Sequence, residues 1–182
     1  MPNDSSQPHR FAVFAWRITA AHVISYFVSG LLALQLLNYQ QLFESPPFSS
    51  FMKPTTSAAV AAGPALQLIR GLIFSLVLWP FRKTLLETSY GWLKLWALLV
   101  GLCILSTSAA APGSIEGFIY TSIPIQKQLY GYFEVLPQTL LFSLMVYYWY
   151  KYPRKSWNII AAVLVGLIVV MSVLGAVVGS RS

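Results

Sequence analysis

Acidic side chains are the first candidates for chemistry, because this chain of 182 residues has only five Asp and Glu residues. Glu116 and Glu134 border apolar sequence, and an enzyme hypothesis makes one of them a general base, with Arg70 as an electrostatic stabiliser. No HExxH, GxSxG or paired-aspartate motif supports that hypothesis. The sequence names no reaction, so the non-enzymatic interpretation is favoured and no catalytic residue is assigned.

His22 lies near the middle of an apolar segment that is long enough to cross a membrane. In such a segment it is too deep to reach either membrane surface. Thr19, Ser25, Tyr26 and Ser29 share one broad side of a helix with it, and we expect this stripe to face protein rather than lipid. Two interpretations stay open. One is a neutral histidine hydrogen-bonded to a neighbouring helix. The other is an axial ligand to a haem or another tetrapyrrole, which would serve a pigment- or lipid-binding or transport protein.

Other cofactor or metal ligands are scarce. The second histidine, His9, lies in a polar tail, so one chain cannot hold a haem between two histidines, although a five-coordinate tetrapyrrole or one shared across a dimer remains open. The single cysteine, Cys103, excludes an internal disulfide and a cysteine-based metal cluster. We therefore expect no metal, and no cofactor other than a tetrapyrrole at His22.

Further polar residues form pairs at helical spacing. Gln67 shares a helix face with Arg70, and Gln138 shares one with Glu134. Both pairs are candidate ligand- or partner-binding residues, while the alternative for Arg70 is a side chain that extends to water. A helix beginning at Pro137 is too short to cross a membrane, so the helix must begin earlier and contain this proline.

Glu116 has two interpretations of its own. Ser114 can cap a short helix in which Glu116 interacts favourably with the helix dipole. Alternatively, Glu116 and Glu134 meet Arg70 or Lys127 in a charged cluster that lines a shallow pocket.

The composition indicates that these residues are positioned by a protein that lies in a membrane rather than in water. Apolar residues make up 57% of the chain and charged residues only 9%, whereas a soluble domain carries about a quarter charged residues. Backbone groups in a bilayer must be hydrogen-bonded within the protein, and long apolar runs favour helices over a barrel. The sequence predicts an all-α integral membrane bundle forming one domain.

Five membrane spans are predicted after a polar N-terminal tail at residues 1–10. They lie near 11–37, 65–81, 91–108, 132–150 and 157–179. The first span is too long for a signal-peptide core, so we expect it to be retained. Two long connectors, 38–64 and 109–131, carry prolines and glycines, and a short interfacial helix is predicted over the SAAVAA stretch at 57–62. Pro64 suits the first turn of the second span.

Basic residues predict the orientation, because short cytoplasmic loops are enriched in Lys and Arg. With the N-terminus inside and the C-terminus outside, the cytoplasmic side receives Arg10, Arg82, Lys83, Lys151, Arg154 and Lys155, with Arg17 and Lys94 just within spans. The outer side receives Lys53, Lys127 and Arg181, with Arg70 just within a span. Both long connectors are then extracytoplasmic, and the net charge of +7 marks topology rather than nucleic-acid binding.

The last span contains Gly175 and Gly179, a GxxxG spacing that lets another backbone approach closely. We expect this helix to be a packing seam, within the chain or against another protein. The sequence as a whole predicts a non-enzymatic protein of a prokaryotic-type plasma (inner) membrane. It is expected to bind another membrane protein, a second copy of itself or a small amphipathic ligand at its extracytoplasmic half.

Overall fold

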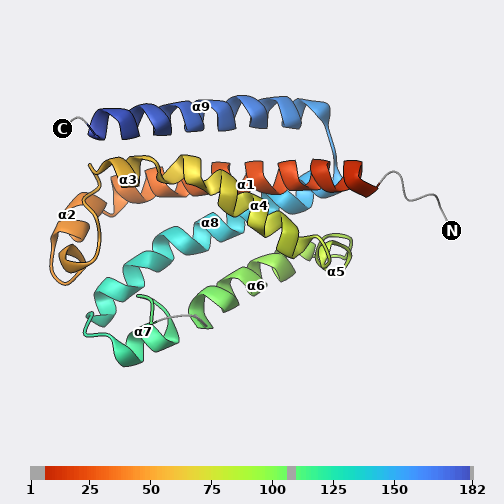
Figure 1. The fold of residues 1–182 in the computed structure, drawn as a ribbon. Coiled ribbons are helices and arrows are strands. Elements are labelled where there is room, and N and C mark those ends of the chain that lie inside the picture. Colours follow the sequence, from red (N-terminus) through yellow and green to blue (C-terminus); the bar gives the residue numbers. More distant parts are fainter. Residues whose placement is uncertain (1–6, 106–109, 181–182) are drawn as a thin grey trace.

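The described chain is built from helices. The computed structural model describes residues 7–105 and 110–180, and no strand occurs among them (Figure 1). The principal helices are α1 Gln7–Leu36, α4 Gly63–Leu78, α6 Gly91–Leu105, α8 Ile125–Lys151 and α9 Lys155–Gly179. Short elements join them: α2 Tyr39–Glu44, the 3-10 turn η2 Phe48–Ser50, α3 Ala58–Ala61, α5 Arg82–Leu86 and α7 Ile115–Tyr120.

Three of these helices, α1, α8 and α9, are long and apolar enough to cross a membrane. The helices α4 and α6 are apolar but shorter within the described residues, and the 16 residues of α4 span only about 24 Å. The prediction of an all-helical bundle suited to a membrane is thus confirmed. The count of five spans stays a prediction.

Helix boundaries differ from expectation where polar residues belong to a helix. The first helix begins at Gln7 rather than residue 11, and α8 begins at Ile125 rather than residue 132, with Pro137 inside it as expected. The first turns of α8 contain Gln126, Lys127 and Gln128, so an apolar window misses them. Residues 1–6 of the predicted tail, 106–108 of the third span, Arg181 and the side chain of His9 lie outside the described residues.

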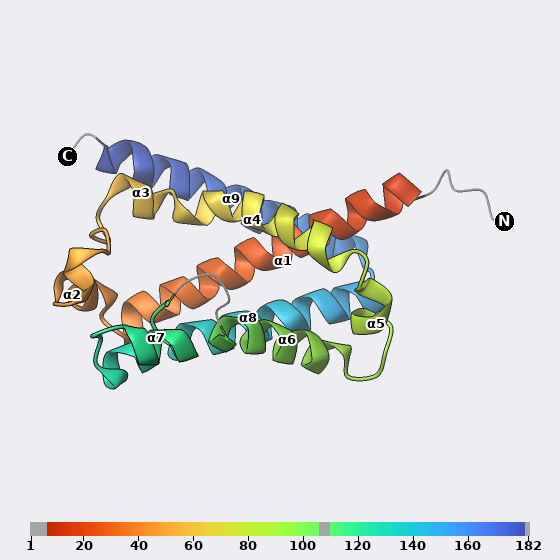
Figure 2. The same cartoon turned by 60° about the horizontal axis from the view of Figure 1, so that its bottom comes forward.

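The principal helices run back and forth between two ends of the bundle (Figures 1 and 2). The basic end comprises the start of α1, α5, the end of α8 and the start of α9. The connector end comprises α2, η2, α3 and α7. In the centre, α1 packs against α4, α8 and α9, while α6 packs against α8.

The tightest helix contact joins α4 to α1. One side of α4 is buried along Gln67, Gly71, Ser75 and Leu78. A Cβ atom added at Gly71 would lie 2.7 Å from the Cα of Thr19, closer than two such atoms approach in proteins. The missing side chain of Gly71 therefore allows the two backbones to approach, as small residues do between membrane helices.

Serine caps start two of the connector helices. The Ser57 hydroxyl accepts a hydrogen bond from the Val60 amide at the start of α3, and Ser114 does the same for the Gly117 amide in α7. The short helix predicted over 57–62 and the capping role of Ser114 are confirmed. Pro64 lies in the first turn of α4, as expected.

The C-terminal half of α9 packs against α3. A Cβ atom added at Gly175 would lie 3.4 Å from the Ala61 Cβ, and one added at Gly179 would lie 3.3 Å from the Ala58 amide nitrogen. The Ser172 hydroxyl donates a 2.6 Å hydrogen bond to the Ala61 carbonyl. The two glycines thus face a segment of the same chain.

Candidate functional site

His22 pairs with Gln67 across the α1–α4 contact. The His22 Nε2 and Gln67 Oε1 atoms are 3.0 Å apart, and both side chains are buried. Gln67 also donates from Nε2 to the Gly63 carbonyl, at 3.2 Å, which fixes the orientation of its amide. The predicted polar stripe faces protein, since Thr19, Ser25 and Ser29 are buried and Tyr26 is partly buried. The structure therefore matches the interpretation of a histidine bonded to a neighbouring helix.

Aromatic rings enclose the His22 imidazole. Its centroid lies 4.8 Å from that of Phe74 and 5.8 Å from that of Phe142, both in edge-to-face geometry. A tetrapyrrole at His22 would have to displace Gln67 from Nε2 and at least one of these rings. The surroundings of His22 thus form a packed contact rather than a cavity for a macrocycle.

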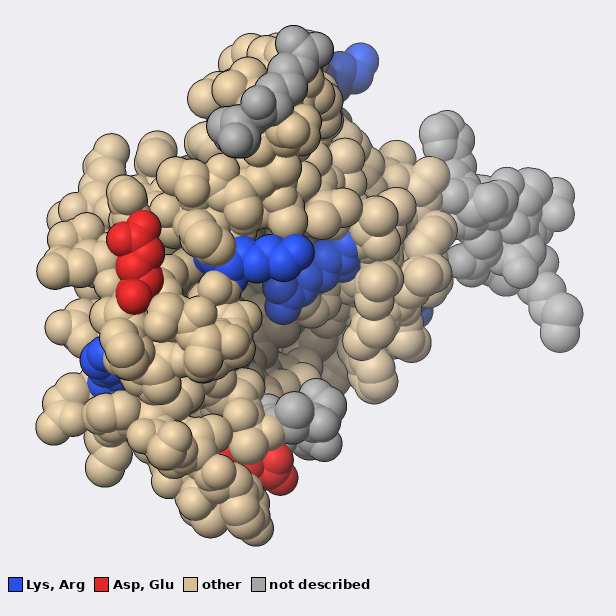
Figure 3. Space-filling view, turned by 60° about the vertical axis from the view of Figure 1, so that its left-hand side comes forward, with Lys and Arg blue, Asp and Glu red and all other residues tan. Residues whose placement is uncertain are grey.

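Arg70 lies one turn beyond Gln67 but is exposed. Its guanidinium carbon is 5.8 Å from the centre of the Phe74 ring, the same ring that packs on His22. Tyr26 lies within electrostatic reach of both Arg70 and Glu134. Viewed with the connector end brought forward, the surface is hollowed, and Lys and Arg side chains lie in the hollow with the acidic side chains apart from them (Figure 3).

Glu134 on α8 is bonded to the start of α2. The Tyr39 hydroxyl donates a 2.5 Å hydrogen bond to its Oε2 atom. Burial of the phenol, together with this bond to a carboxylate, raises the pKa of Tyr39 well above its usual value, so the hydroxyl remains a donor at all ordinary pH values. Gln138, one turn further along α8, is partly buried.

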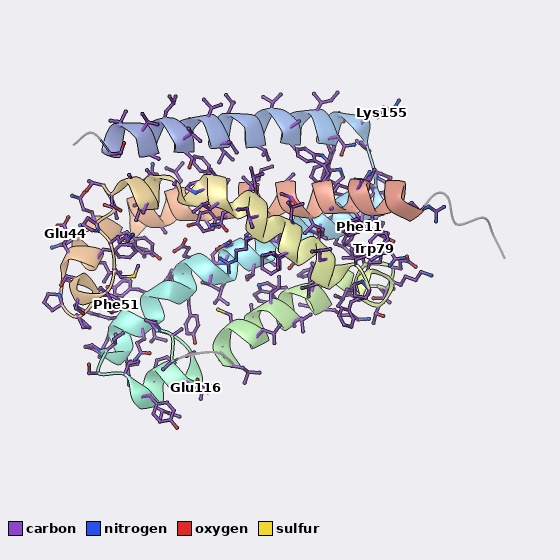
Figure 4. The ribbon with its side chains drawn as sticks, viewed as in Figure 1. Phe11, Glu44, Phe51, Trp79, Glu116 and Lys155 are labelled. Carbon is purple, nitrogen blue, oxygen red and sulfur yellow. The ribbon has the colours of Figure 1, made fainter. Side chains whose placement is uncertain are left out.

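Glu116 does not lie beside Arg70. It lies on α7, which packs on α6 and α8, while Arg70 lies on α4 across the bundle (Figures 1 and 4). Lys127 donates from Nζ to the Ser45 hydroxyl and to the Pro46 carbonyl, which ties α8 to the first connector. In the described part of the chain, neither Arg70 nor Lys127 forms an ion pair with Glu116 or Glu134, so the structure does not show the alternative in which the two acids meet one of these cations.

Six side chains nevertheless lie between the middle of α1 and the connector end: the hydrogen-bonded pairs His22–Gln67 and Tyr39–Glu134, with Tyr26 and Arg70 within electrostatic range of them. We call this set the polar cluster; it consists of His22, Tyr26, Tyr39, Gln67, Arg70 and Glu134. Sequence reasoning missed the role of Tyr39, which lies in a proline-rich connector without helical periodicity. For Tyr26 the sequence predicted only that it shares one side of α1 with His22.

The polar cluster can bind by hydrogen bonding and charge, but its one imidazole and one carboxylate do not make up a metal site. Among the described residues, no three His, Cys, Asp or Glu side chains converge on a point that could hold a metal ion. The cluster offers a cation at Arg70, a carboxylate at Glu134 and two phenols. Such a set fits recognition of a polar or amphipathic molecule better than it fits metal-dependent chemistry.

Comparison with known proteins adds no relative, since no protein-family model, curated protein or solved structure matches this chain.

Proposed function

We propose that this protein is a non-enzymatic, multi-pass protein of a prokaryotic-type plasma membrane. It binds a small amphipathic ligand through the polar cluster, or else a partner membrane protein. The cluster then lies in the extracytoplasmic half, because the proposal includes five spans with the N-terminus in the cytoplasm and the C-terminus outside.

Two observations support this topology. The helices α1, α4, α6, α8 and α9 alternate in direction between the two ends (Figure 2), as consecutive spans must. The basic end carries most of the cations near helix ends, including Arg82 on α5 and Lys155 at the start of α9. An end rich in Lys and Arg is typical of the cytoplasmic side.

The observation that carries the binding proposal is the exposure of Arg70 within an apolar helix beside a buried hydrogen-bonded pair. An arginine in a membrane helix is costly unless it reaches water or meets an anionic group. Arg70 lies beside Phe74, so an apolar surface and a cation are presented together. An amphipathic molecule with an acidic group satisfies both.

A partner membrane protein is the second candidate because of α9. This helix exposes large apolar side chains along most of its length, among them Val163, Leu167, Val170 and Leu174. Lipid covers such a face as well as a protein does, so the two occupants must be separated by experiment.

Purification in mild detergent, followed by mass spectrometry of bound small molecules and proteins, tests the proposal. We expect one species to co-purify in stoichiometric amount with the wild type and to fall at least tenfold with Arg70→Gln, because a charge-assisted contact is worth about 1.5–3 kcal/mol. Arg154→Gln, at the basic end, removes the same charge and is expected to retain the species.

The outcome identifies the ligand class as well. A visible absorbance near a Soret band that disappears with His22→Leu would instead establish a tetrapyrrole, contrary to the packed surroundings of His22. Equal retention by wild type, Arg70→Gln and Arg154→Gln would show that the polar cluster is not the binding site.

A further inference from the structure

A cavity of about 690 Å³ opens at the basic end, away from the polar cluster. It lies between the first turns of α1, the junction of α4 with α5, and the last turns of α8. Its volume is in the range of small-molecule sites, which is about 300–1,000 Å³. It is therefore large enough for a ligand headgroup with part of an attached chain.

The described residues that line this cavity are strongly unbalanced in charge. Four are cations and one is an acid: Arg10, Arg17, Arg82, Lys83 and Glu87. The carboxylate of Glu87 accepts a 2.8 Å hydrogen bond from the Tyr150 hydroxyl. Positioning cations to mark the cytoplasmic side does not require them to line one cavity, so this convergence calls for a further explanation.

Arg82 is held in place by Trp79. Its guanidinium lies 3.8 Å from the centre of the indole ring, and its Nη1 donates a 2.7 Å hydrogen bond to the Trp79 carbonyl. The indole ring in turn makes edge-to-face contacts, with Phe11 at 5.2 Å (Figure 4) and with Phe14 at 5.3 Å between ring centroids. A stacked guanidinium keeps other donors available for an anion and loses little freedom on binding.

Arg17, which also lines the cavity, has a buried donor that lacks an acceptor among the described residues. Its Nη1 donates a 3.4 Å hydrogen bond to the Trp149 carbonyl, but its Nε–H is buried with no acceptor in the described part of the chain. A buried donor without a partner is costly. An acceptor supplied by a ligand in the cavity that Arg17 lines would satisfy it.

The remaining walls are apolar. Val13 and Ile18 of α1 face the cavity together with Val146 of α8. Planar arginine forks match the oxygens of a phosphate, while the apolar walls match an alkyl or acyl chain. Basic pockets between membrane helices are known to bind acidic lipid headgroups in this way.

We propose that this cavity binds the phosphate group of an anionic amphiphile, with the phosphate against Arg17 and Arg82 and the chain against the apolar wall. The proposal is independent of the function assigned to the polar cluster, because the two sites lie at opposite ends and share no residue.

Binding is measured by native mass spectrometry of the full chain in detergent, titrated with dioleoylphosphatidylglycerol. Dioleoylphosphatidylcholine, which has a phosphate but no net charge, is the lipid control. We expect phosphatidylglycerol to bind at one site and at least tenfold more tightly than phosphatidylcholine. Arg17→Gln and Arg82→Gln are each expected to weaken it about tenfold or more, because each removes a charge-assisted contact.

Lys155→Gln is the matched control, since it removes one exposed cation from the same end without touching the cavity (Figure 4). It is expected to leave the affinity within about twofold of wild type, as a peripheral charge contributes little. Lys83→Gln, an exposed position on the cavity wall, serves where an arginine variant fails to fold. It is expected to weaken binding by a smaller factor than the arginine variants.

Competition with glycerol 3-phosphate distinguishes the two sources of the phosphate. Displacement of phosphatidylglycerol by glycerol 3-phosphate would assign the cavity to a water-soluble phosphate ester and overturn the amphiphile as its ligand, whereas no displacement would support a lipid. Equal binding of the two lipids, an equal loss with Lys155→Gln, or unchanged affinity in every cavity variant that folds would overturn the proposal.

Discussion

Replacing Gly71 with leucine is expected to prevent the protein from folding into a monodisperse species in detergent. The added side chain would start 2.7 Å from the Thr19 Cα, and this neighbour is backbone, which cannot rotate away. The helices α1 and α4 would have to separate, breaking the contact that also holds His22 and Gln67 together. Gel filtration and the yield of folded protein measure the effect.

The smaller substitution Gly71→Ala allows the effect on stability to be measured. We expect it to lower the free energy of unfolding by about 1–3 kcal/mol, as overpacking does in a close-packed core. Gly166→Ala and Gly101→Ala are matched controls, because a Cβ atom at either position meets nothing within 4 Å. These controls are expected to be neutral or slightly stabilising, since alanine favours helix more than glycine does. Equal effects at Gly71 and Gly166 would contradict the close α1–α4 approach.

Removing one partner of the His22–Gln67 pair is expected to lower the free energy of unfolding by more than the hydrogen bond itself contributes, because the other partner stays buried. His22→Leu leaves the Gln67 Oε1 buried without this donor, and Gln67→Leu leaves the imidazole Nε2 unpaired, at a cost of about 1–3 kcal/mol each. The double variant removes both polar groups. Its loss should therefore be smaller than the sum of the two single losses.

A double-mutant cycle on unfolding by sodium dodecyl sulfate measures the difference. We expect a coupling of about 0.5–2 kcal/mol, the range found for hydrogen bonds between membrane helices. His22→Leu combined with Gln126→Leu, an exposed site on α8, should be additive. Additive losses for His22 and Gln67 themselves would show that the two side chains do not bond.

The sequence predicted those parts of the fold that depend on local rules. Ser114 and Pro64 occupy helix starts because capping and a missing N–H depend only on neighbouring residues. The start of α8 was placed too late because its first turn is polar. Gln128, buried there, donates to the Ile123 carbonyl and accepts from the Gly113 amide, and neither bond leaves a periodic signal.

The packing of helices was less predictable. The GxxxG of α9 drew attention to Gly175, yet the close approach between two long helices, α1 and α4, lies at Gly71. Gly71 and Ser75 have the same small-xxx-small spacing, and that signal was available in the sequence. Choosing between two such seams requires knowing which helices are neighbours, and this depends on the whole bundle.

For the candidate sites, too, individual residues could be predicted from the sequence but their contacts could not. His22 and Gln67 each stood out as polar residues in apolar helices, but their pairing joins residues 45 positions apart. The basic cavity was missed because Arg10, Arg17, Arg82 and Lys83 were interpreted as markers of topology. Both roles are compatible, since a cation at the cytoplasmic boundary can also bind an anion.

The orientation of the bundle decides which side of the membrane each site faces, and single-cysteine labelling measures it. In a Cys103→Ser background, cysteine is placed at Lys53 in the first connector or at Arg154 between α8 and α9, both exposed positions. Intact cells are treated with a membrane-impermeant maleimide. We predict that cysteine at position 53 is labelled before lysis and cysteine at position 154 only after permeabilisation, whereas the opposite pattern, or labelling of both in intact cells, would contradict the account.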